Sequence, residues 1–157
     1  MAFARLGIVS FVLLCASCAS TPEASPERDA AAKEFEAVTR DAVIYVYRPD
    51  ARGTSTNTTL WVDERLNGES LPRTYFRNIV FPGRNVIETS PPDSGRIVVR
   101  THPSEVIYVE MRTTGGSEEG SPSSHFRVMP AKEAQAAIRA CCTRLEIWHH
   151  GQPRLLW

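Results

Sequence analysis

The chain has 157 residues, and its 18 Lys and Arg against 18 Asp and Glu make it formally neutral at pH 7. This neutrality and the lack of a long basic run give no electrostatic support for a nucleic-acid partner. The length suits one domain with a sizeable core, which does not need a disulfide framework. After the N-terminal segment, no apolar stretch approaches the length of a membrane span.

The N-terminal segment has the order of a secretory signal peptide. A single charge at Arg5 precedes an apolar run at 6–14, and small residues follow that run. The run is too short for a mature membrane-spanning helix. We therefore predict that residues 1–17 are a signal peptide.

The residues Ala16, Ser17 and Cys18 resemble the end of a bacterial lipobox, in which the cysteine becomes the lipid-bearing first residue of the mature protein. The position three before Cys18, usually Leu in that motif, is Cys15 here. Lipid on Cys18 implies attachment to a membrane of the bacterial envelope. Ala19 resembles the pattern of lipoproteins that proceed to the outer membrane and face the periplasm. The alternative is a secreted periplasmic protein that is cut just beyond, for example after Ala19.

Residues 18–40 are predicted to be a tether that contains a short helix. Small, polar and proline residues fill 19–28, a composition typical of a flexible linker. Ser25 suits a helix N-cap, Pro26 suits the first helical position, and the Ala-rich stretch after them has high helix propensity. Phe35 and Val38 lie three apart, so we expect this helix to make a small apolar contact with the domain.

Residues 41–157 are predicted to form a mainly β domain. The stretch 42–48 is apolar on both alternating faces, which is typical of a central strand. Further strands are predicted at 59–63, around Leu66 with a turn at Asn67-Gly68, and at 74–81, 85–88, 96–101 and 106–111. Turn residues separate these strands without long helical crossovers, which favours an antiparallel β-sandwich of about seven strands over a parallel sheet.

The C-terminal part of the domain is predicted to be less regular. Residues 113–124 are rich in Gly, Ser and Pro and are expected to form a mobile loop, and 125–129 a short extended piece. A short helix is predicted at 131–142, because Ala134, Ile138 and Cys141 recur at helical spacing. The tail at 145–157 is predicted to form two short strands around a turn.

Four stretches carry a resemblance to a known family. They are Ala-Val-Ile-Tyr-Val-Tyr-Arg-Pro at 42–49, Val-Asp at 62–63, Phe-Pro-Gly-Arg-Asn-Val-Ile-Glu at 81–88 and Val-Ile-Tyr-Val at 106–109. Together they resemble DUF2846, a bacterial family of secreted proteins and lipoproteins with no assigned activity. Glu64 stands where the family tends to have Gly. The resemblance implies a β-sandwich envelope lipoprotein and transfers no catalytic residue.

His149 and His150 are the most tempting metal ligands in the chain. Neighbouring residues in a strand point to opposite faces, so this pair needs a bend to hold one ion. No Cys or His lies at a conventional ligand spacing from the pair. We therefore predict a solvated pair before a turn at Gly151, and no metal site.

Cys141 and Cys142 are the two cysteines outside the N-terminal segment. Adjacent cysteines close only a strained ring, so no structural disulfide is expected. Cys141 falls on the apolar stripe of the predicted helix, whereas Cys142 lies about 100° further round and is expected to be the accessible thiol. A Cys–His nucleophile would pair one of them with His125 or His149. Pairing of Cys142 with another chain is a further possibility.

Aromatic and charged residues on the strands complete the candidate sites. Aromatic residues are expected to fill the core, and some of them would line a sugar or peptide groove if they faced outward. These are Tyr45, Tyr47, Trp61, Tyr75, Phe76, Phe81 and Tyr108. Four charged residues are expected at strand edges or on the surface, with Arg48 able to pair with Asp63. These are Arg48, Asp63, Arg77 and Arg100.

Together these features predict a non-catalytic envelope lipoprotein, a β-sandwich that binds a protein or cell-wall partner and is held to the membrane by lipid on Cys18. No catalytic residue, metal or cofactor is predicted. One alternative is a periplasmic small-ligand carrier, which an unfilled apolar cavity would favour. The other is a hydrolase that uses Cys142 or a lid at 113–124, which a buried polar cluster with perturbed titration beside that segment would favour.

Overall fold

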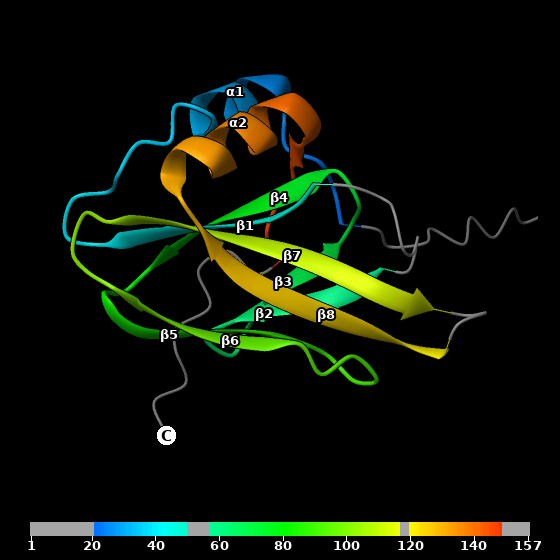
Figure 1. Cartoon of the computed structure of the whole chain (residues 1–157). Helices are drawn as coiled ribbons and strands as arrows, with labels where there is room; N and C mark the ends of the chain where they lie inside the picture. The colour runs from blue at the N-terminus through cyan, green and yellow to red at the C-terminus, as the bar shows by residue number, and fades with distance from the viewer. Residues whose placement is uncertain (1–20, 50–56, 117–119, 149–157) are drawn as a thin grey trace, which may run out of the picture.

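The computed structural model describes residues 21–49, 57–116 and 120–148 (Figure 1). The elements are α1 (Pro26–Ala32), β1 (Ala42–Arg48), β2 (Thr58–Val62), β3 (Arg65–Ser70), β4 (Thr74–Val80), β5 (Gly83–Thr89), β6 (Arg96–Thr101), β7 (Val106–Gly116), β8 (Gly120–Met129), α2 (Ala131–Cys141) and β9 (Thr143–Arg144). The predicted mainly β fold with a short C-terminal helix is confirmed. The described residues hold nine strands in two sheets, more than the expected number of about seven.

The strands form a five-stranded sheet in the order β8-β7-β1-β4-β9 and a four-stranded sheet in the order β3-β2-β5-β6. All seven residues of β1 are buried, as predicted for a central strand. The two helices lie together over one face of the five-stranded sheet (Figure 1). The fold therefore has three layers, with the five-stranded sheet in the middle.

The prediction that all pairing is antiparallel is wrong for two strand pairs. β1 runs parallel to β7, with Val43 opposite Val106 and Tyr47 opposite Glu110, and β4 runs parallel to β9. Parallel neighbours need a long crossover, and the chain between β1 and β7 builds β4 and all four strands of the other sheet. Strands replace the expected crossover helix, so the lack of a helical pattern did not exclude a parallel pair.

The two sheets share an aliphatic core. Its buried members within strands come from β1, β4 and β7 of the five-stranded sheet and from β2, β5 and β6, and Phe126 of the edge strand β8 packs against them. Its fully buried members include Ile44, Leu60, Ile87, Val109 and Met111. Burial of such side chains supplies about 1.5–3 kcal/mol each.

A second core lies between the five-stranded sheet and the helices. Its members from the sheet are mostly tyrosines, and Ala134 and Ile138 of the predicted apolar stripe pack on them from α2. Tyr45 is buried on the same face as Val43 and Tyr47, as predicted. That face lies under the helices and not between the sheets, so the expected placement of Tyr45 inside the sandwich is wrong. A strand that is apolar on both faces does not tell which layer covers which face.

From Thr21 to β1 the chain is packed, so residues 21–28 are not the flexible linker that was expected there. Thr21 and Ala24 are buried, and the Ala24 N–H donates to the Arg144 carbonyl over 2.8 Å. The predicted helix exists, with Ser25 as its N-cap and Pro26 in its first turn. Phe35 is buried in the tyrosine core, so the contact with the domain is much closer than expected.

Residues 113–124 were expected to form a loop, but most of them extend β7 and β8 into a long hairpin. Thr113 pairs with Ser124 and Thr114 with Ser123, while residues 117–119 lie outside the described part of the chain. Thr113 and Ser124 are buried and share a hydrogen bond of 2.9 Å. Cross-strand pairing and burial therefore override the low strand propensity of a Ser- and Gly-rich segment.

The turn predicted at Asn67-Gly68 is wrong. Asn67 and Gly68 lie within β3, where the pairing with β2 carries a bulge, and the turn falls at Asp63 and Glu64. Both turn residues have positive φ values, 50° and 63°, as a two-residue type I′ hairpin turn requires. The Asp63 carboxylate stabilises the turn by accepting a hydrogen bond of 2.8 Å from the Val86 N–H of β5.

At the C-terminal end, β9 is short and Leu145 bridges to Glu23 of the N-terminal segment. The first predicted tail strand, at 145–148, is wrong, because only Leu145 makes a β-bridge there. The predicted turn and second tail strand lie outside the described residues, as does the predicted signal peptide. Within the part that is described, none of the helices has the length and apolar character needed to cross a membrane.

Candidate functional site

The sequence-predicted site residues are only partly visible. Cys18, His149 and His150 lie outside the described residues, so the structure does not test them. Across residues 21–49, 57–116 and 120–148, no three His, Cys, Asp or Glu side chains gather in a way that would hold a metal ion.

The cysteine prediction is wrong on two counts. Cys141 and Cys142 form a disulfide with each other, although adjacent cysteines were expected to remain unpaired. Cys142 is buried at 3% exposure in the tyrosine core, whereas Cys141 is half-buried. The helix ends at Cys141 and the next residue is extended, so the helical angle used to place the Cys142 side chain outside does not apply. A bonded, buried sulfur is not the exposed thiolate that a nucleophile requires.

Most of the predicted aromatic core is confirmed. Five of the seven residues are buried, Trp61 is half-buried, and Phe81 is 58% exposed. Trp61 lies next to the turn region before β6, where its Nε1–H donates to the Ser90 hydroxyl over 2.6 Å. Five of these aromatic side chains therefore build the molecule's interior, whereas Phe81 lies on its surface.

Arg48 was expected at an edge or on the surface, but it is 2% exposed. It ends the central strand, and its guanidinium donates to the Ser70 carbonyl of β3 in the other sheet. Arg100 is exposed as predicted, and Arg77 is half-buried. Arg48 therefore connects the two sheets.

A first candidate site is a buried polar cluster around Asp93, in the connection between β5 and β6. The Asp93 carboxylate accepts hydrogen bonds from the Thr58 hydroxyl at 3.0 Å, the Gly95 N–H at 3.0 Å and the Ser124 N–H at 2.8 Å. The Ser124 hydroxyl also donates to it, and the Thr113 hydroxyl lies 2.9 Å from that hydroxyl. The cluster adjoins the segment at 113–124, which is where a hydrolase site was considered.

The hydrogen bonds of Asp93 suit a structural role, because they connect separate parts of the fold. Burial alone would raise the pKa of Asp93, but the hydrogen bonds from Ser124, Gly95 and Thr58 outweigh burial and hold the pKa below its ordinary value. A general base for a serine nucleophile needs a pKa near the working pH. A Cβ on Gly95 would lie 2.5 Å from the Ser124 carbonyl oxygen, so the loop packs directly on β8. The cluster joins β2, β8 and the β5–β6 connection.

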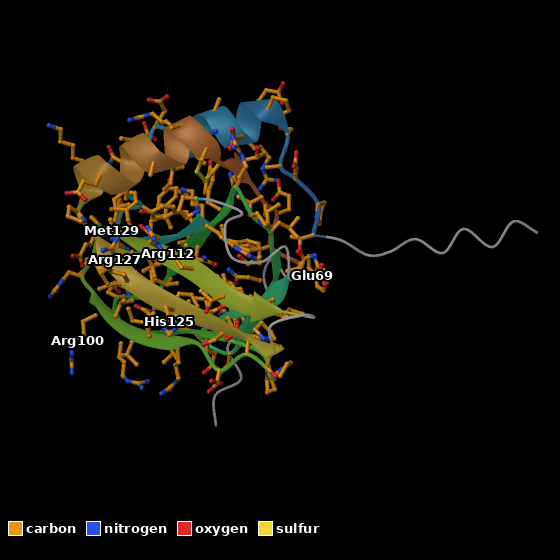
Figure 2. All side chains as sticks on the ribbon, turned by 45° about the vertical axis from the view of Figure 1, so that its right-hand side comes forward. Glu69, Arg100, Arg112, His125, Arg127 and Met129 are labelled. Carbon is orange, nitrogen blue, oxygen red and sulfur yellow. A yellow bond between two sulfur atoms is a disulfide. The ribbon has the colours of Figure 1, made fainter. Side chains whose placement is uncertain are left out.

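A second candidate site lies on β7 and β8, on the same side of the five-stranded sheet as the helices, where Arg112, His125 and Arg127 remain exposed. Glu110 of β7 is 5% exposed, and its carboxylate binds Arg112 of β7 and, over 3.3 Å, Arg127 of β8. The Tyr47 hydroxyl donates to the same carboxylate over 3.4 Å. Figure 2 places Arg112 beside Arg127, and His125 pairs across the strands with Arg112. We call Glu110, Arg112, His125 and Arg127 the arginine face.

The electrostatics of the arginine face keep the Tyr47 hydroxyl beneath it in its neutral form. Burial, followed by the nearby Glu110 carboxylate, raises the pKa of Tyr47 to about 12, so this hydroxyl stays protonated. The side chains of Arg112 and Arg127 are each 64% exposed although both contact Glu110. The buried carboxylate thus contacts and orients two guanidinium groups whose side chains are largely exposed.

Sequence reasoning missed the arginine face. The alternation of Tyr108, Glu110 and Arg112 on one side of the strand was available as a signal. Its partners Arg127 and His125 follow a segment that was predicted to be a loop, so no strand register was assigned to them. The register between β7 and β8 is what brings these charges together.

Comparisons with known proteins give one curated relative and no function. An "Uncharacterized protein" from Haemophilus influenzae (strain ATCC 51907 / DSM 11121 / KW20 / Rd) is 28% identical over 138 residues, which cover 87% of this chain and 81% of the relative. No family model matches the chain, and no solved structure matches it. The resemblance to DUF2846 therefore stays a prediction.

Proposed function

We propose that this protein is a non-catalytic envelope lipoprotein. In this proposal lipid on Cys18 holds it to the outer membrane on the periplasmic side, and the two sheets form a β-sandwich that acts as a binding module. The lipobox-like sequence before Cys18 supports the anchor. The partner is a protein or a cell-wall component with acidic groups.

The observation that carries the binding role is the exposure of Arg112 and Arg127 above a buried carboxylate. A guanidinium presents several N–H donors in a planar fork that fits a carboxylate in two parallel hydrogen bonds. Glu110 occupies part of each fork, and 64% of each side chain remains exposed. Two such groups on a flat sheet face suit the carboxylates of an acidic protein or of cell-wall peptides.

The anchor is tested with Cys18→Ala. This variant is expected to move from the membrane fraction into the soluble periplasmic fraction, because no acyl chain is then attached. The protein with Ser17→Ala, which keeps the cysteine, is the matched control and should remain with the membrane. A Cys18→Ala variant that sediments with membranes like the unmodified protein contradicts the anchor.

The arginine face is tested with the triple variant Glu110→Gln, Arg112→Gln and Arg127→Gln. Changing the carboxylate together with its arginines avoids leaving a buried charge without a partner. The variant should lose co-sedimentation with purified cell-wall sacculi and lose acidic proteins captured from envelopes, while a melt checks that it folds. Arg100→Gln on β6, an exposed arginine of the other sheet, should keep both. Equal binding by the two variants contradicts the proposed face.

A further inference from the structure

The chain becomes fixed very soon after Cys18. Thr21 is 3% exposed, and its hydroxyl accepts a hydrogen bond of 2.6 Å from the Glu69 N–H of β3. The Glu146 N–H donates to the Pro22 carbonyl over 2.9 Å. The N-terminal segment is thus hydrogen-bonded to β3 and to the residues that follow β9, beginning at Thr21.

This attachment limits how far the domain lies from any lipid on Cys18. Ala19 and Ser20 alone separate Cys18 from Thr21. A fully extended chain spans at most about 3.6 Å per residue, so the Cα of Cys18 lies within about 11 Å of the Cα of Thr21. A flexible tether through residue 28 would have left ten residues between Cys18 and the packed domain. The observed packing leaves two, Ala19 and Ser20, so the domain must stay close to the lipid.

The surface around Thr21 carries an exposed tryptophan. Both Thr21 and Trp148 pack over Gly68, where an added Cβ would lie 2.8 Å from the Thr21 hydroxyl oxygen and 3.2 Å from Cδ1 of Trp148. Trp148 is 38% exposed, and its backbone N–H donates to the Asn67 carbonyl over 2.9 Å. Tryptophan is favoured at the headgroup level of membranes, because its ring is apolar and its N–H is polar.

We infer that the side of the domain formed by Thr21, β3 and Trp148 lies on the phospholipid surface, with the Trp148 ring at the headgroup level. This inference rests on the proposed lipidation of Cys18. β3 and β6 are the two edges of the four-stranded sheet, and Figure 2 shows Glu69 of β3 and Arg100 of β6 on opposite sides of the molecule. The short connection therefore turns β6 away from the membrane.

Fluorescence quenching tests this orientation in the lipidated full-length protein. Trp61→Phe and Trp157→Phe leave Trp148 as the single tryptophan. The protein is placed in vesicles of phosphatidylethanolamine and phosphatidylglycerol, with or without brominated acyl chains. The control adds Trp148→Phe and Val98→Trp, which moves the tryptophan to an exposed position on β6.

We expect brominated lipid to remove a large part of the Trp148 fluorescence and to leave the emission at position 98 nearly unchanged. Equal quenching at the two positions, or none at Trp148, overturns the inference. Vesicle flotation and the mass of the N-terminal peptide report lipidation in the same samples. A lipidated, floating protein without Trp148 quenching refutes the orientation alone, whereas a chain without lipid refutes the proposed anchor and the orientation with it.

Discussion

The two faces of the five-stranded sheet are both buried, but by different chemistry. The face toward the other sheet is mostly aliphatic, with Ile44, Val109 and Met111 fully buried. The face toward the helices is built on Tyr45, Tyr47, Tyr75 and Tyr108. Aliphatic burial has no preferred direction, whereas a buried hydroxyl must find a partner. The tyrosine face therefore also determines where the helices lie.

Three of these hydroxyls bond directly to the helices. Tyr45 donates to the Ala32 carbonyl over 2.6 Å, and Tyr75 donates to the Asp29 carboxylate over 2.9 Å, both on α1. Tyr108 accepts from the Gln135 side chain of α2 over 2.7 Å. An α1 of seven residues is too short to be stable alone, so these contacts hold it in place.

The largest effect is expected from Tyr45→Ala. Its ring centroid lies 5.2 Å from that of Phe35 and 5.3 Å from that of Tyr108, so truncation opens a cavity in the tyrosine core. The cost should be about 3–5 kcal/mol, comparable with a whole domain's stability of about 5–15 kcal/mol. His149→Ala with His150→Ala should melt like the unmodified protein. The prediction would be contradicted if the histidine variant lost melting temperature while Tyr45→Ala melted like the unmodified protein.

A smaller loss is expected from Asp29→Ala, which tests whether polar bonds position α1. The carboxylate also accepts from Lys33 at 2.7 Å and from the Arg144 N–H at 2.9 Å. Loss of such charge-assisted bonds should cost about 1.5–3 kcal/mol in chemical denaturation. Amide exchange should increase in residues 21–35, while the aliphatic core stays protected. Glu34→Ala, which removes an exposed carboxylate just after α1, is the control and should change neither measurement.

The same carboxylate predicts a pH dependence. Burial acts to raise the pKa of Asp29, but its bonds to Lys33, Tyr75 and Arg144 outweigh burial and leave the pKa lowered. The folded state therefore binds this proton less readily than the unfolded state, and stability falls as the pH drops from above the unfolded pKa through the folded pKa. The loss on acidification should be smaller in Asp29→Ala. Identical acid profiles for the two proteins would contradict this account.

For the aliphatic face, Ile44→Val should cost about 0.5–1.5 kcal/mol, because one methylene is lost from a packed core. Tyr45→Phe, at the next position of the same strand, keeps the ring but removes the hydroxyl that donates to the Ala32 carbonyl and accepts from Arg77 Nε. It should cost about 1–3 kcal/mol. Only Tyr45→Phe should increase amide exchange in α1. If Ile44→Val loosens α1 equally, the two faces do not differ in the way described.

The mildest test leaves neutral-pH stability nearly unchanged. The folded pKa of Tyr47 is raised to about 12, first by burial and then by Glu110. Its stabilising contribution is complete below the unfolded pKa near 10 and is lost as the pH rises toward 12. Tyr47→Phe should therefore flatten the decline in melting temperature over that alkaline range. A decline as steep as that of the unmodified protein would show that other groups cause it.

Several elements were predictable from local sequence alone. β1 and β6 have the predicted bounds, because their apolar patterns and flanking turn residues act locally. α2 begins at Ala131 as predicted, directly after Pro130. The central position of β1 followed from its two apolar faces. In the candidate site, the strand that carries Glu110 was predicted, but its contact with Arg127 was not.

The sequence by itself determined where most of the strands and both helices lie, because propensity and periodicity act over a few neighbouring residues. Only the tertiary structure decided that β7 joins β1 in parallel, that Tyr45 faces helices, and that Ser124 extends a hairpin. It also decided that the chain is fixed from Thr21 onward, through a bond to Glu69 that spans 48 positions. Such contacts depend on which distant surfaces meet, and that information is spread over the whole chain and not contained in any local pattern.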